Sequence, residues 1–397
     1  MAALVASGEL RLRIDKDGGF RGPFCGMGVC QECLVDVDGA SAERACMIKV
    51  DRAMTVRRQA SRVAIDGKVT DRPADQPFLQ LPALTPQIAV IGGGPGGMAE
   101  ATNAARSGAD VLLIDERPQL GGQFYKQPLA ASDLQLADFD DQQFLGGRRL
   151  IGELEGSGAR LMHSARVVGA YEPLDLVVGV ENETRLVRPQ ILIVATGAYE
   201  ISYPFDGWTL PGVMTTGAAQ TLLRSYRVLP GQRVLVAGNG PLNFQVAAEL
   251  ARSGADVVAV VEAAARPGLY DLNTIARMMT ADARLALKGA GYLSTLGRRG
   301  VPLLFGHRIS RVSALDGGNR PRLLAVIDGL SGDNSQTREF EADAVCLGYG
   351  FRPSNDILRA LGCEHTVNPH TGALETVRDK DCRTSRNNVL AVGDCTR

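Results

Sequence analysis

Residues 87–116 read QIAVIGGGPGGMAEATNAARSGADVLLIDE, and this stretch decides the fold. The apolar run 87–91 predicts a buried strand, and the glycine-rich turn after it predicts the start of a helix that continues to about residue 107. A second apolar strand is predicted at 111–114. Strand, glycine turn, helix and strand in this order form one βαβ unit with parallel strands.

Four residues of this unit have the spacing of a dinucleotide-binding site. Gly92, Gly94 and Gly97 form the pattern G-x-G-x-x-G at the turn from strand to helix. These glycines permit a tight turn, a close approach of the backbone to a pyrophosphate, and close packing of helix on strand. The N–H groups and the dipole at the helix N-terminus favour phosphates. Asp115, at the end of the next strand, can accept hydrogen bonds from ribose hydroxyls.

Three further segments favour FAD over NAD as this dinucleotide. The segments RPQLGGQFY (117–125), IVATGAYE (193–200) and NNVLAVGDC (387–395) resemble the flavin loop, the return motif and the ribityl-binding strand of flavoproteins that have two dinucleotide-binding domains. They occur in the order and spacing of that group. The residues that would contact FAD are Gly121, Gly122, Gln123, Thr196, Gly197, Gly393 and Asp394.

A second βαβ pattern occupies residues 233–262, RVLVAGNGPLNFQVAAELARSGADVVAVVE. Gly238 and Gly240 repeat the first two glycines, but Asn243 stands at the third position, where its side chain would push the helix away from the strand. Glu262 ends the next strand and favours a ribose with free hydroxyls over a 2′-phosphate. Three interpretations stay open: this fold binds NAD, it holds another adenine nucleotide without hydride chemistry, or it is an empty structural remnant.

The cysteine cluster in residues 20–46 (FRGPFCGMGVCQECLVDVDGASAERAC) is the most specific motif of the chain. Cys25-x4-Cys30-x2-Cys33 followed by Cys46 has the spacing of plant-type [2Fe–2S] proteins. The glycines of the loop let it curl, with backbone N–H groups directed at the sulfurs. The alternative is a structural zinc site, but zinc favours two C-x2-C pairs and only one is present. We therefore predict a [2Fe–2S] cluster on these four cysteines.

The composition limits the other possibilities. The chain has 397 residues, of which 45% are hydrophobic and 22% charged, and its net charge is −1. Without a long charged block, neither nucleic acid nor an anionic membrane is expected as a partner. No apolar run approaches the length of a membrane-spanning helix. Eight cysteines with four of them clustered indicate metal binding in a reducing cytoplasm rather than disulfides.

No catalytic constellation is evident in the remaining residues. The four histidines (His163, His307, His365 and His370) are scattered, and the four other cysteines (Cys346, Cys363, Cys382 and Cys395) lack metal-ligand spacing and are expected to be structural. No C-x-x-C pair lies near the second fold, which argues against a disulfide relay. We therefore predict no catalytic residue.

The order of motifs resembles the α-type subunits of multi-subunit amine oxidoreductases. This group includes hydrogen cyanide synthase, opine oxidases, hydroxyproline and proline dehydrogenases, and the sarcosine oxidase α subunit. The resemblance covers nearly the whole chain and includes GWTLPGVMTTGAAQTLL (207–223), GVPLLFGH (300–307) and CLGYGFRPS (346–354). Relative to this group the chain begins and ends abruptly, so it looks truncated at both ends.

The resemblance implies an α/β fold with several parts. These are an N-terminal β-grasp [2Fe–2S] ferredoxin-like domain and a two-dinucleotide-binding-domain flavoprotein with Rossmann-like FAD and NAD(P)-type folds. The predicted ranges are 1–60 for the ferredoxin-like domain, 61–86 for a linker, 87–205 for the first part of the FAD-binding domain, 206–330 for the second dinucleotide domain and 331–397 for the return segment of the FAD-binding domain.

The resemblance also implies a function. A partner β-type flavin subunit would oxidise an amino acid or secondary amine, and this chain would relay the electrons to an acceptor such as a quinone. The chain would be cytoplasmic, reaching the inner face of the membrane only through its partners. The alternative is a self-contained NAD(P)H-dependent reductase that passes electrons through FAD to its own cluster. A third hypothesis is a cofactor-free assembly scaffold.

Overall fold

The computed structural model describes residues 1–59, 83–128, 142–180, 183–268, 280, 282–315, 322–330 and 337–397. The chain divides into two units: unit 1 comprises Met1–Val63 and Glu200–Gly350, and unit 2 comprises Ala64–Tyr199 and Phe351–Arg397. Most of the predicted linker at 61–86 lies outside the described residues. The chain returns to unit 2 after Gly350, whereas the sequence places the start of the return segment at residue 331.

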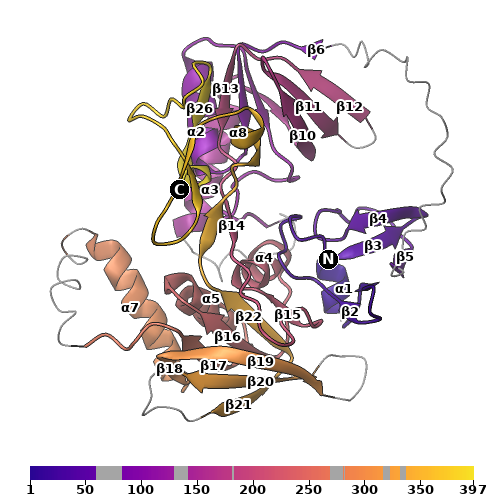
Figure 1. Cartoon of the computed structure of the whole chain (residues 1–397), viewed down its shortest axis with the longest axis vertical. Coiled ribbons are helices and arrows are strands. Elements are labelled where there is room, and N and C mark those ends of the chain that lie inside the picture. The colour runs from indigo at the N-terminus through magenta and orange to yellow at the C-terminus, as the bar shows by residue number, and fades with distance from the viewer. Residues whose placement is uncertain are drawn as a thin grey trace. The chain divides into compact units, whose positions relative to one another are not determined.

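Unit 2 is built on a five-stranded parallel sheet with the order β26-β13-β7-β8-β9. Strands β26 and β13 are far apart in sequence but lie side by side in this sheet (Figure 1). The strand β8 is buried at all four positions, as expected for a parallel sheet with both faces covered. The strands are β7 (Ile88–Ile91), β8 (Val111–Ile114), β9 (Arg160–Met162), β13 (Ile191–Val194) and β26 (Val389–Ala391).

The connections of this sheet create a topological switch point beside β7. The helix α2 (Pro95–Arg106) joins β7 to β8, and α3 (Gln142–Glu155) precedes β9, so the chain first runs to one side of β7. The strand β13 then pairs with the other side of β7. In open α/β sheets, ligands bind outside the carboxyl ends of the strands at such a point.

Unit 2 also contains a second sheet and several shorter elements. A second sheet has the order β10-β11-β12-β6, in which three antiparallel strands are joined by β6, parallel to β12. Its strands are β6 (Ala83–Leu84), β10 (Ala165–Tyr171), β11 (Asp175–Val180) and β12 (Glu183–Val187). The remaining elements are β14 (Ala198–Glu200), β23 (Phe351–Pro353), α8 (Asp356–Ala360), the hairpin β24 (His365–Val367) and β25 (Leu374–Thr376), and the short 3-10 helix η3 (Gly393–Cys395).

Unit 1 repeats the parallel-sheet architecture with the order β15-β22-β16-β17-β18. An antiparallel sheet, β19-β20-β21, is inserted in the chain between β18 and β22 of the parallel sheet. The strands are β15 (Val213–Thr215), β16 (Arg233–Gly238), β17 (Asp256–Glu262), β18 (Leu303–Phe305), β19 (His307–Leu315), β20 (Arg322–Gly329), β21 (Arg338–Ala342) and β22 (Ala344–Gly348). The helices are α4 (Thr216–Tyr226), α5 (Pro241–Arg252) and α7 (Ala283–Arg298).

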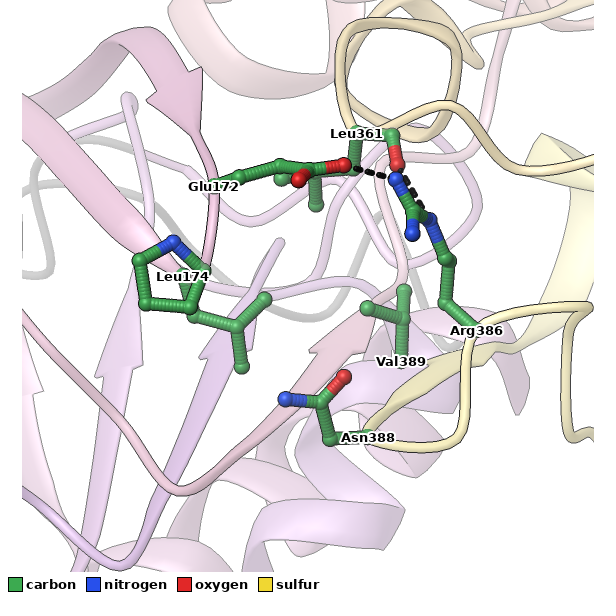
Figure 2. A pocket seen from close by; sticks show the side chains of 7 residues that line it. Glu172, Leu174, Leu361, Arg386, Asn388 and Val389 are labelled. Carbon is green, nitrogen blue, oxygen red and sulfur yellow. Dashed lines mark hydrogen bonds and ion pairs between the residues drawn. The ribbon is translucent and has the colours of Figure 1, made fainter.

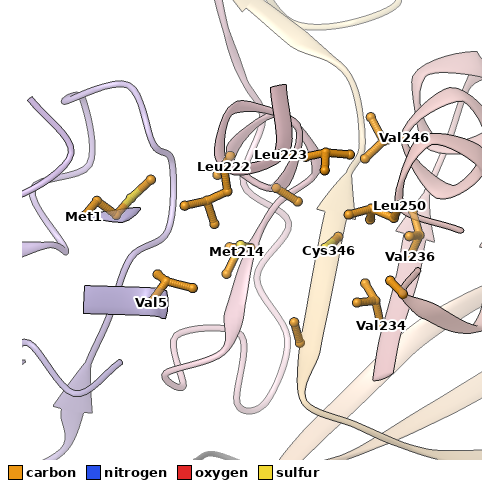
Figure 3. Packing of buried hydrophobic residues seen from close by; sticks show 14 of the residues in the cluster. Met1, Val5, Met214, Leu222, Leu223, Val234, Val236, Val246, Leu250 and Cys346 are labelled. Atoms are coloured by element: carbon orange, nitrogen blue, oxygen red, sulfur yellow. The ribbon is translucent and has the colours of Figure 1, made fainter. Parts of the chain in front are cut away.

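The N-terminal part of unit 1 carries the cysteine cluster. Its elements are α1 (Ala2–Ala6), the pair β1 (Arg13–Ile14) and β2 (Phe20–Arg21), and an antiparallel sheet β4-β3-β5 formed by β3 (Leu34–Val37), β4 (Ala40–Arg44) and β5 (Val56–Arg58). This part shares one apolar core with the second parallel sheet. Figure 3 shows Met214 and Leu222 between Val5 of α1 and Cys346 of β22.

Candidate cofactor sites

The glycine turn between β7 and α2 has the close approaches that require glycine. A Cβ on Gly97 would lie 1.9 Å from the carbonyl oxygen of Gly92, and a Cβ on Gly92 would lie 2.3 Å from that of Ala195. Gly94 is the N-cap of α2, and among the described residues a Cβ there would meet no heavy atom within 4 Å. Gly92 and Gly97 therefore serve the packing of the protein itself, whereas Gly94 leaves open space at the helix N-terminus.

Asp115 is fixed at the carboxyl end of β8 by the same turn. Its carboxylate accepts hydrogen bonds from the main-chain N–H groups of Gly93 and, at 2.7 Å, Arg117. Burial raises the pKa of this carboxyl group above its ordinary value, although both N–H groups oppose the shift. The glycine spacing alone did not single out Gly93, whose N–H orients the acid.

The other predicted flavin-binding residues lie around the same end of the sheet. A Cβ on Gly122 would lie 2.9 Å from Cα of Gly94, so the Gly121–Gly122 loop packs against the turn. Thr196 follows β13, and its hydroxyl donates to the carbonyl of Ser354. Asp394 lies in η3 directly after β26 and is exposed to solvent. Gln123 is half-buried, and Gly197 and Gly393 have φ angles of +72° and +78°.

These residues fit a dinucleotide with a pyrophosphate. They follow strands β7, β8, β13 and β26, which run parallel and are all part of one sheet, so they share its carboxyl edge. The free space at Gly94 is a cradle that a side chain would fill. The helix N-terminus beside it offers N–H groups and a favourable dipole to phosphate.

The second fold contains a comparable turn between β16 and α5. Gly240 is the N-cap of α5 with φ of +117°, and its N–H donates to Glu262 at 3.0 Å. Glu262 also accepts from the N–H of Ala264 at 2.9 Å, so it repeats the two-bond arrangement of Asp115. A Cβ on Gly238 would lie 2.0 Å from the carbonyl oxygen of Gly348.

Asn243, which stands where the third glycine is expected, is buried and fully engaged within the protein. Its amide nitrogen donates to the carbonyl of Gly348 at 2.9 Å, and its amide oxygen accepts from the Thr216 hydroxyl at 3.0 Å. The asparagine therefore links the dinucleotide turn to the start of α4, a role that the spacing alone did not reveal. These bonds satisfy the buried amide and leave the occupant of this fold open.

The four clustered thiols are arranged as two pairs. The thiol of Cys30 donates a hydrogen bond to Cys25, which lowers the pKa of Cys25 to about 5 and raises that of Cys30. Cys46 and Cys33 form the second pair, with the pKa of Cys33 lowered and that of Cys46 raised for the same reason. The thiolate is the form that binds iron, and the lowered pKa values of Cys25 and Cys33 favour it.

Backbone N–H groups in this loop point at the sulfurs. The N–H of Met27 lies 3.4 Å from Sγ of Cys25, and the N–H of Glu32 lies 3.4 Å from Sγ of Cys30. Gly26 and Gly28 adopt φ angles of +64° and +79°, which let the loop curl. Two thiol pairs with N–H groups directed at the sulfurs fit a two-iron cluster, with one pair for each iron.

Most of the remaining cysteines are buried, and two of the histidines bond main-chain carbonyl groups. All eight cysteines are free thiols, and Cys346, Cys363 and Cys395 are buried. Burial raises the pKa of Cys395, and its thiol donates to the carbonyl of Val194 at 3.3 Å. The ring of His307 bonds the carbonyl of Phe305 at 2.7 Å, and His365 bonds that of Cys363.

A small cavity of about 210 Å³ in unit 2 lies away from these residues. It is next to Asn388 and Val389, at the amino end of β26, whereas the flavin-binding candidates follow the carboxyl ends of the strands. Figure 2 shows that Arg386 pairs with Glu172 at its rim. Within the described residues the cavity holds none of the predicted site residues.

Residues 86–397, most of the chain, match the family model for pyridine nucleotide-disulphide oxidoreductases. The chain belongs to the pyridine nucleotide-disulphide oxidoreductase family. Residues 1–61 match the model for a 2Fe-2S iron-sulfur cluster binding domain. This member of the family therefore has FAD and a [2Fe–2S] cluster as cofactors, and the predicted α/β flavoprotein fold with an N-terminal iron–sulfur domain is confirmed.

Two curated relatives are each 32% identical to this family member. They are an opine oxidase subunit of Rhizobium meliloti, over 309 residues, and the hydrogen cyanide synthase subunit HcnB of Pseudomonas protegens, over 317 residues. Each alignment covers 77% of this chain and 65% of the relative, so the chain spans just under two thirds of their length. The predicted resemblance to subunits of amine oxidoreductases is thereby confirmed.

A solved structure shares the fold over the whole chain. The crystal structure of L-proline dehydrogenase from P. horikoshii matches with a TM-score of 0.64 at 18% identity, and the match covers 100% of this chain and 65% of that chain. In the part of the chain that the structure describes, no helix is long and apolar enough to cross a membrane.

Proposed function

We propose that this chain is the electron-transfer component of a multi-subunit amine oxidoreductase. It relays electrons from the oxidation of an amino acid or secondary amine, of the glycine, opine, hydroxyproline or sarcosine type, on a partner subunit. The proposal rests on two cofactor sites in one chain. One is the carboxyl edge of the parallel sheet of unit 2, where the predicted flavin-binding residues lie, and the other consists of the two thiol pairs of unit 1. FAD handles electron pairs and the cluster handles single electrons, so together they connect two-electron amine oxidation to one-electron acceptors.

Each flavin-binding residue has a role in this proposal. Gly92, Gly94 and Gly97 let the pyrophosphate approach the N-terminus of α2, and Asp115 accepts from the ribose hydroxyls. Asp394, exposed at the end of β26, accepts from the ribityl chain. The loop and return residues Gly121, Gly122, Gln123, Thr196, Gly197 and Gly393 complete the flavin contacts.

The cluster ligands in this proposal are the two thiol pairs. Cys25 and Cys30 hold one iron, and Cys33 and Cys46 hold the other. The N–H groups of Met27 and Glu32 stabilise the negative charge on the sulfurs and contribute to the reduction potential.

The remaining cysteines support a relay of electrons to other proteins rather than to a disulfide. All eight cysteines lie in described residues, and none of the four outside the cluster is half of a C-x-x-C pair. Burial raises the pKa of Cys346 and Cys395, which keeps these thiols protonated and unreactive. A disulfide relay of the thioredoxin-reductase type needs two exchangeable thiols, so we do not propose one.

The substrate class and the partners follow from the relatives. Opine oxidase and hydrogen cyanide synthase are both represented by named subunits, so a partner chain is expected here as well. We propose that a β-type flavin subunit holds the amine pocket, that a quinone or similar acceptor takes the electrons, and that the assembly works in the cytoplasm. We propose no part for nucleic acid in this function, and no membrane-spanning helix is found among the described residues.

The experiment compares the isolated chain with the chain co-expressed with its partner. The isolated chain is expected to bind flavin and iron but to oxidise neither proline, glycine, sarcosine nor opines. With its partner present, the correct amine should bleach the flavin band of this chain. Strong amine oxidation by the isolated chain would contradict the proposal, and so would a colourless preparation without iron or flavin.

The geometry of the second fold keeps an NAD(P)H-dependent reductase as the second candidate. No described residue approaches within 4 Å of a Cβ built on Gly240, and Glu262 is held at the strand end as in the first fold. Anaerobic mixing of the isolated chain with NADH separates the two candidates. Rapid bleaching of the flavin would favour the reductase, whereas unchanged flavin would favour the relay.

A further inference from the structure

Residues 207–223, termed the docking segment, contact the loop that holds the first cysteine. The main-chain N–H of Thr215 donates to the carbonyl of Phe24 at 2.9 Å. The ring of Phe24 meets that of Trp208 edge to face, with centroids 5.4 Å apart and planes at 82°. Phe24 directly precedes Cys25, so these two contacts fix the backbone next to a proposed iron ligand.

The glycines on both sides of Phe24 fit closely against the docking segment. A Cβ on Gly26 would lie 3.0 Å from Cβ of Ala218, and a Cβ on Gly22 would lie 3.3 Å from Cα of Pro211. Residues 22, 24 and 26 therefore all contact the docking segment. At Ala218, which is 1% exposed, a larger side chain would need space that Gly26 occupies.

The start of α4 within the docking segment is capped by residues outside the cysteine loop. Thr215 is the N-cap of α4, and its hydroxyl accepts from the N–H of Ala218 at 3.1 Å. The buried carboxylate of Glu200 accepts from the N–H of Gly217 at 2.8 and 3.0 Å. The helix start that faces the cysteine loop is therefore capped twice without help from the loop.

Apolar packing continues from the docking segment to the second thiol pair. Cys33 and Cys46 belong to the same buried cluster as Met214, Ala218 and Leu222. Water is thereby kept from this side of Cys33 and Cys46. Solvent exposure and nearby hydrogen bonds are two of the factors that set the potential of an iron–sulfur cluster.

We propose that the docking segment is the surface that positions the iron–sulfur cluster, with Trp208 and Ala218 as positioning residues. It holds residues 22–26 in place and shields the cluster from water on one side. The family resemblance singled out this segment, but neither set of proposed cofactor ligands uses it. The inference rests on the proposed cluster ligands of the preceding subsection.

The first test is Ala218→Leu in the full-length holoprotein, with Ala218→Ser as the control of similar size. The leucine is expected to push Gly26 away, to change the EPR spectrum of the reduced cluster, and to speed iron release to a chelator by about tenfold. The serine variant should behave as the wild type. Flavin content is measured in each sample, because the proposed flavin residues lie in unit 2 and report that the chain is folded.

The second test needs no disruptive substitution. Trp208 is the single tryptophan of the chain, so its fluorescence reports one site. A cluster held next to Phe24 should quench this emission. Removing the cluster while FAD stays bound should restore the emission several-fold, and Trp208→Phe identifies the background.

The outcomes separate this inference from the function on which it rests. If the wild type contains no iron, the cluster assignment itself fails. If the cluster is present but Trp208 emission is the same with and without it, and Ala218→Leu releases iron at the wild-type rate, the docking proposal alone is wrong. If Ala218→Leu fails to fold, the emission of Trp208 in the wild type decides.

Discussion

The carboxylate of Asp115 accepts a hydrogen bond from the main-chain N–H of Gly93, in the middle of the glycine turn. Glu262 accepts from the N–H of Gly240, one position farther along the turn of the second fold. Both acids also accept from the N–H two residues farther along the chain. The glycine turn of each fold therefore fixes the position of its acid in the absence of a ribose.

Burial of Asp115 predicts a specific pH dependence of stability. Its pKa is raised in the folded chain above the ordinary 3.8. At pH values between 3.8 and the pKa of the folded chain, the folded state therefore binds more protons than the unfolded state. The free energy of unfolding of the flavin-free chain should therefore fall as pH rises through this window, and level off above the folded pKa. Denaturant titrations from pH 4 to 7 should show this fall in the wild type, and Asp115→Asn should lack it. Asp110→Asn, at an exposed ion pair, is the control, and parallel curves for wild type and Asp115→Asn would contradict the prediction.

Gly94 allows a test of the flavin cradle that leaves the fold intact. Its φ of −76° suits alanine, and the new Cβ would meet no atom within 4 Å in the described part of the chain. Gly94→Ala should therefore unfold at the wild-type temperature when flavin-free, yet bind FAD more weakly by about 1–3 kcal/mol, the usual cost of an extra methyl in a filled site. Gly152→Ala on α3, which also faces open space, is the matched control. Equal FAD affinity in Gly94→Ala and the control would place the pyrophosphate elsewhere.

Local pattern was enough to predict the first βαβ unit. The predicted strand at 87–91, helix to about 107 and strand at 111–114 correspond to β7 (Ile88–Ile91), α2 (Pro95–Arg106) and β8 (Val111–Ile114). The reason is physical: the apolar runs must be buried on both faces, and Gly92 and Gly97 have no space for a side chain. The grouping of the cysteines followed from spacing for a similar reason, because three of the four thiols lie in one loop.

Contacts between distant segments could not be predicted in this way. Nothing in residues 20–46 indicates that Phe24 packs on Trp208, or that Gly26 is small because Ala218 lies against it. The spacing suggested that Asn243 would push its helix outward, but it did not reveal the two partners that engage the amide, Thr216 and Gly348. Both cases depend on which segments the tertiary fold brings together.

Removing one partner of the buried ion pair between α4 and α5 is expected to destabilise unit 1. Arg224 donates to Glu249 through Nη2 at 2.6 Å and through Nε at 3.0 Å, and both side chains are at most 7% exposed. Glu249→Gln should lower the free energy of unfolding by about 3–5 kcal/mol, because it removes the negative charge that the buried guanidinium of Arg224 contacts. The double variant Arg224→Met with Glu249→Leu should recover most of this loss, since it removes both charges. Thermal denaturation of the three proteins checks the prediction, and a double variant as unstable as Glu249→Gln would contradict it.

The proposed cluster ligands predict how individual cysteine substitutions behave. Cys30 belongs to the Cys25 pair, and serine in its place removes one thiolate from one iron. Cys30→Ser should therefore reduce the iron content from about two per chain to near zero. FAD should stay bound, because its proposed site lies in unit 2. Iron analysis and visible absorption of anaerobically purified protein measure both cofactors in one sample.

Two controls make the cysteine experiment decisive. Cys382→Ser changes a half-buried thiol outside the cluster and should keep both cofactors at wild-type levels. Cys46→Ser should lose iron as completely as Cys30→Ser, because each iron needs both thiols of its pair. If Cys46→Ser kept its iron while Cys382→Ser lost it, the fourth ligand would be Cys382. Cys33 and Cys46 would then not bind one iron together.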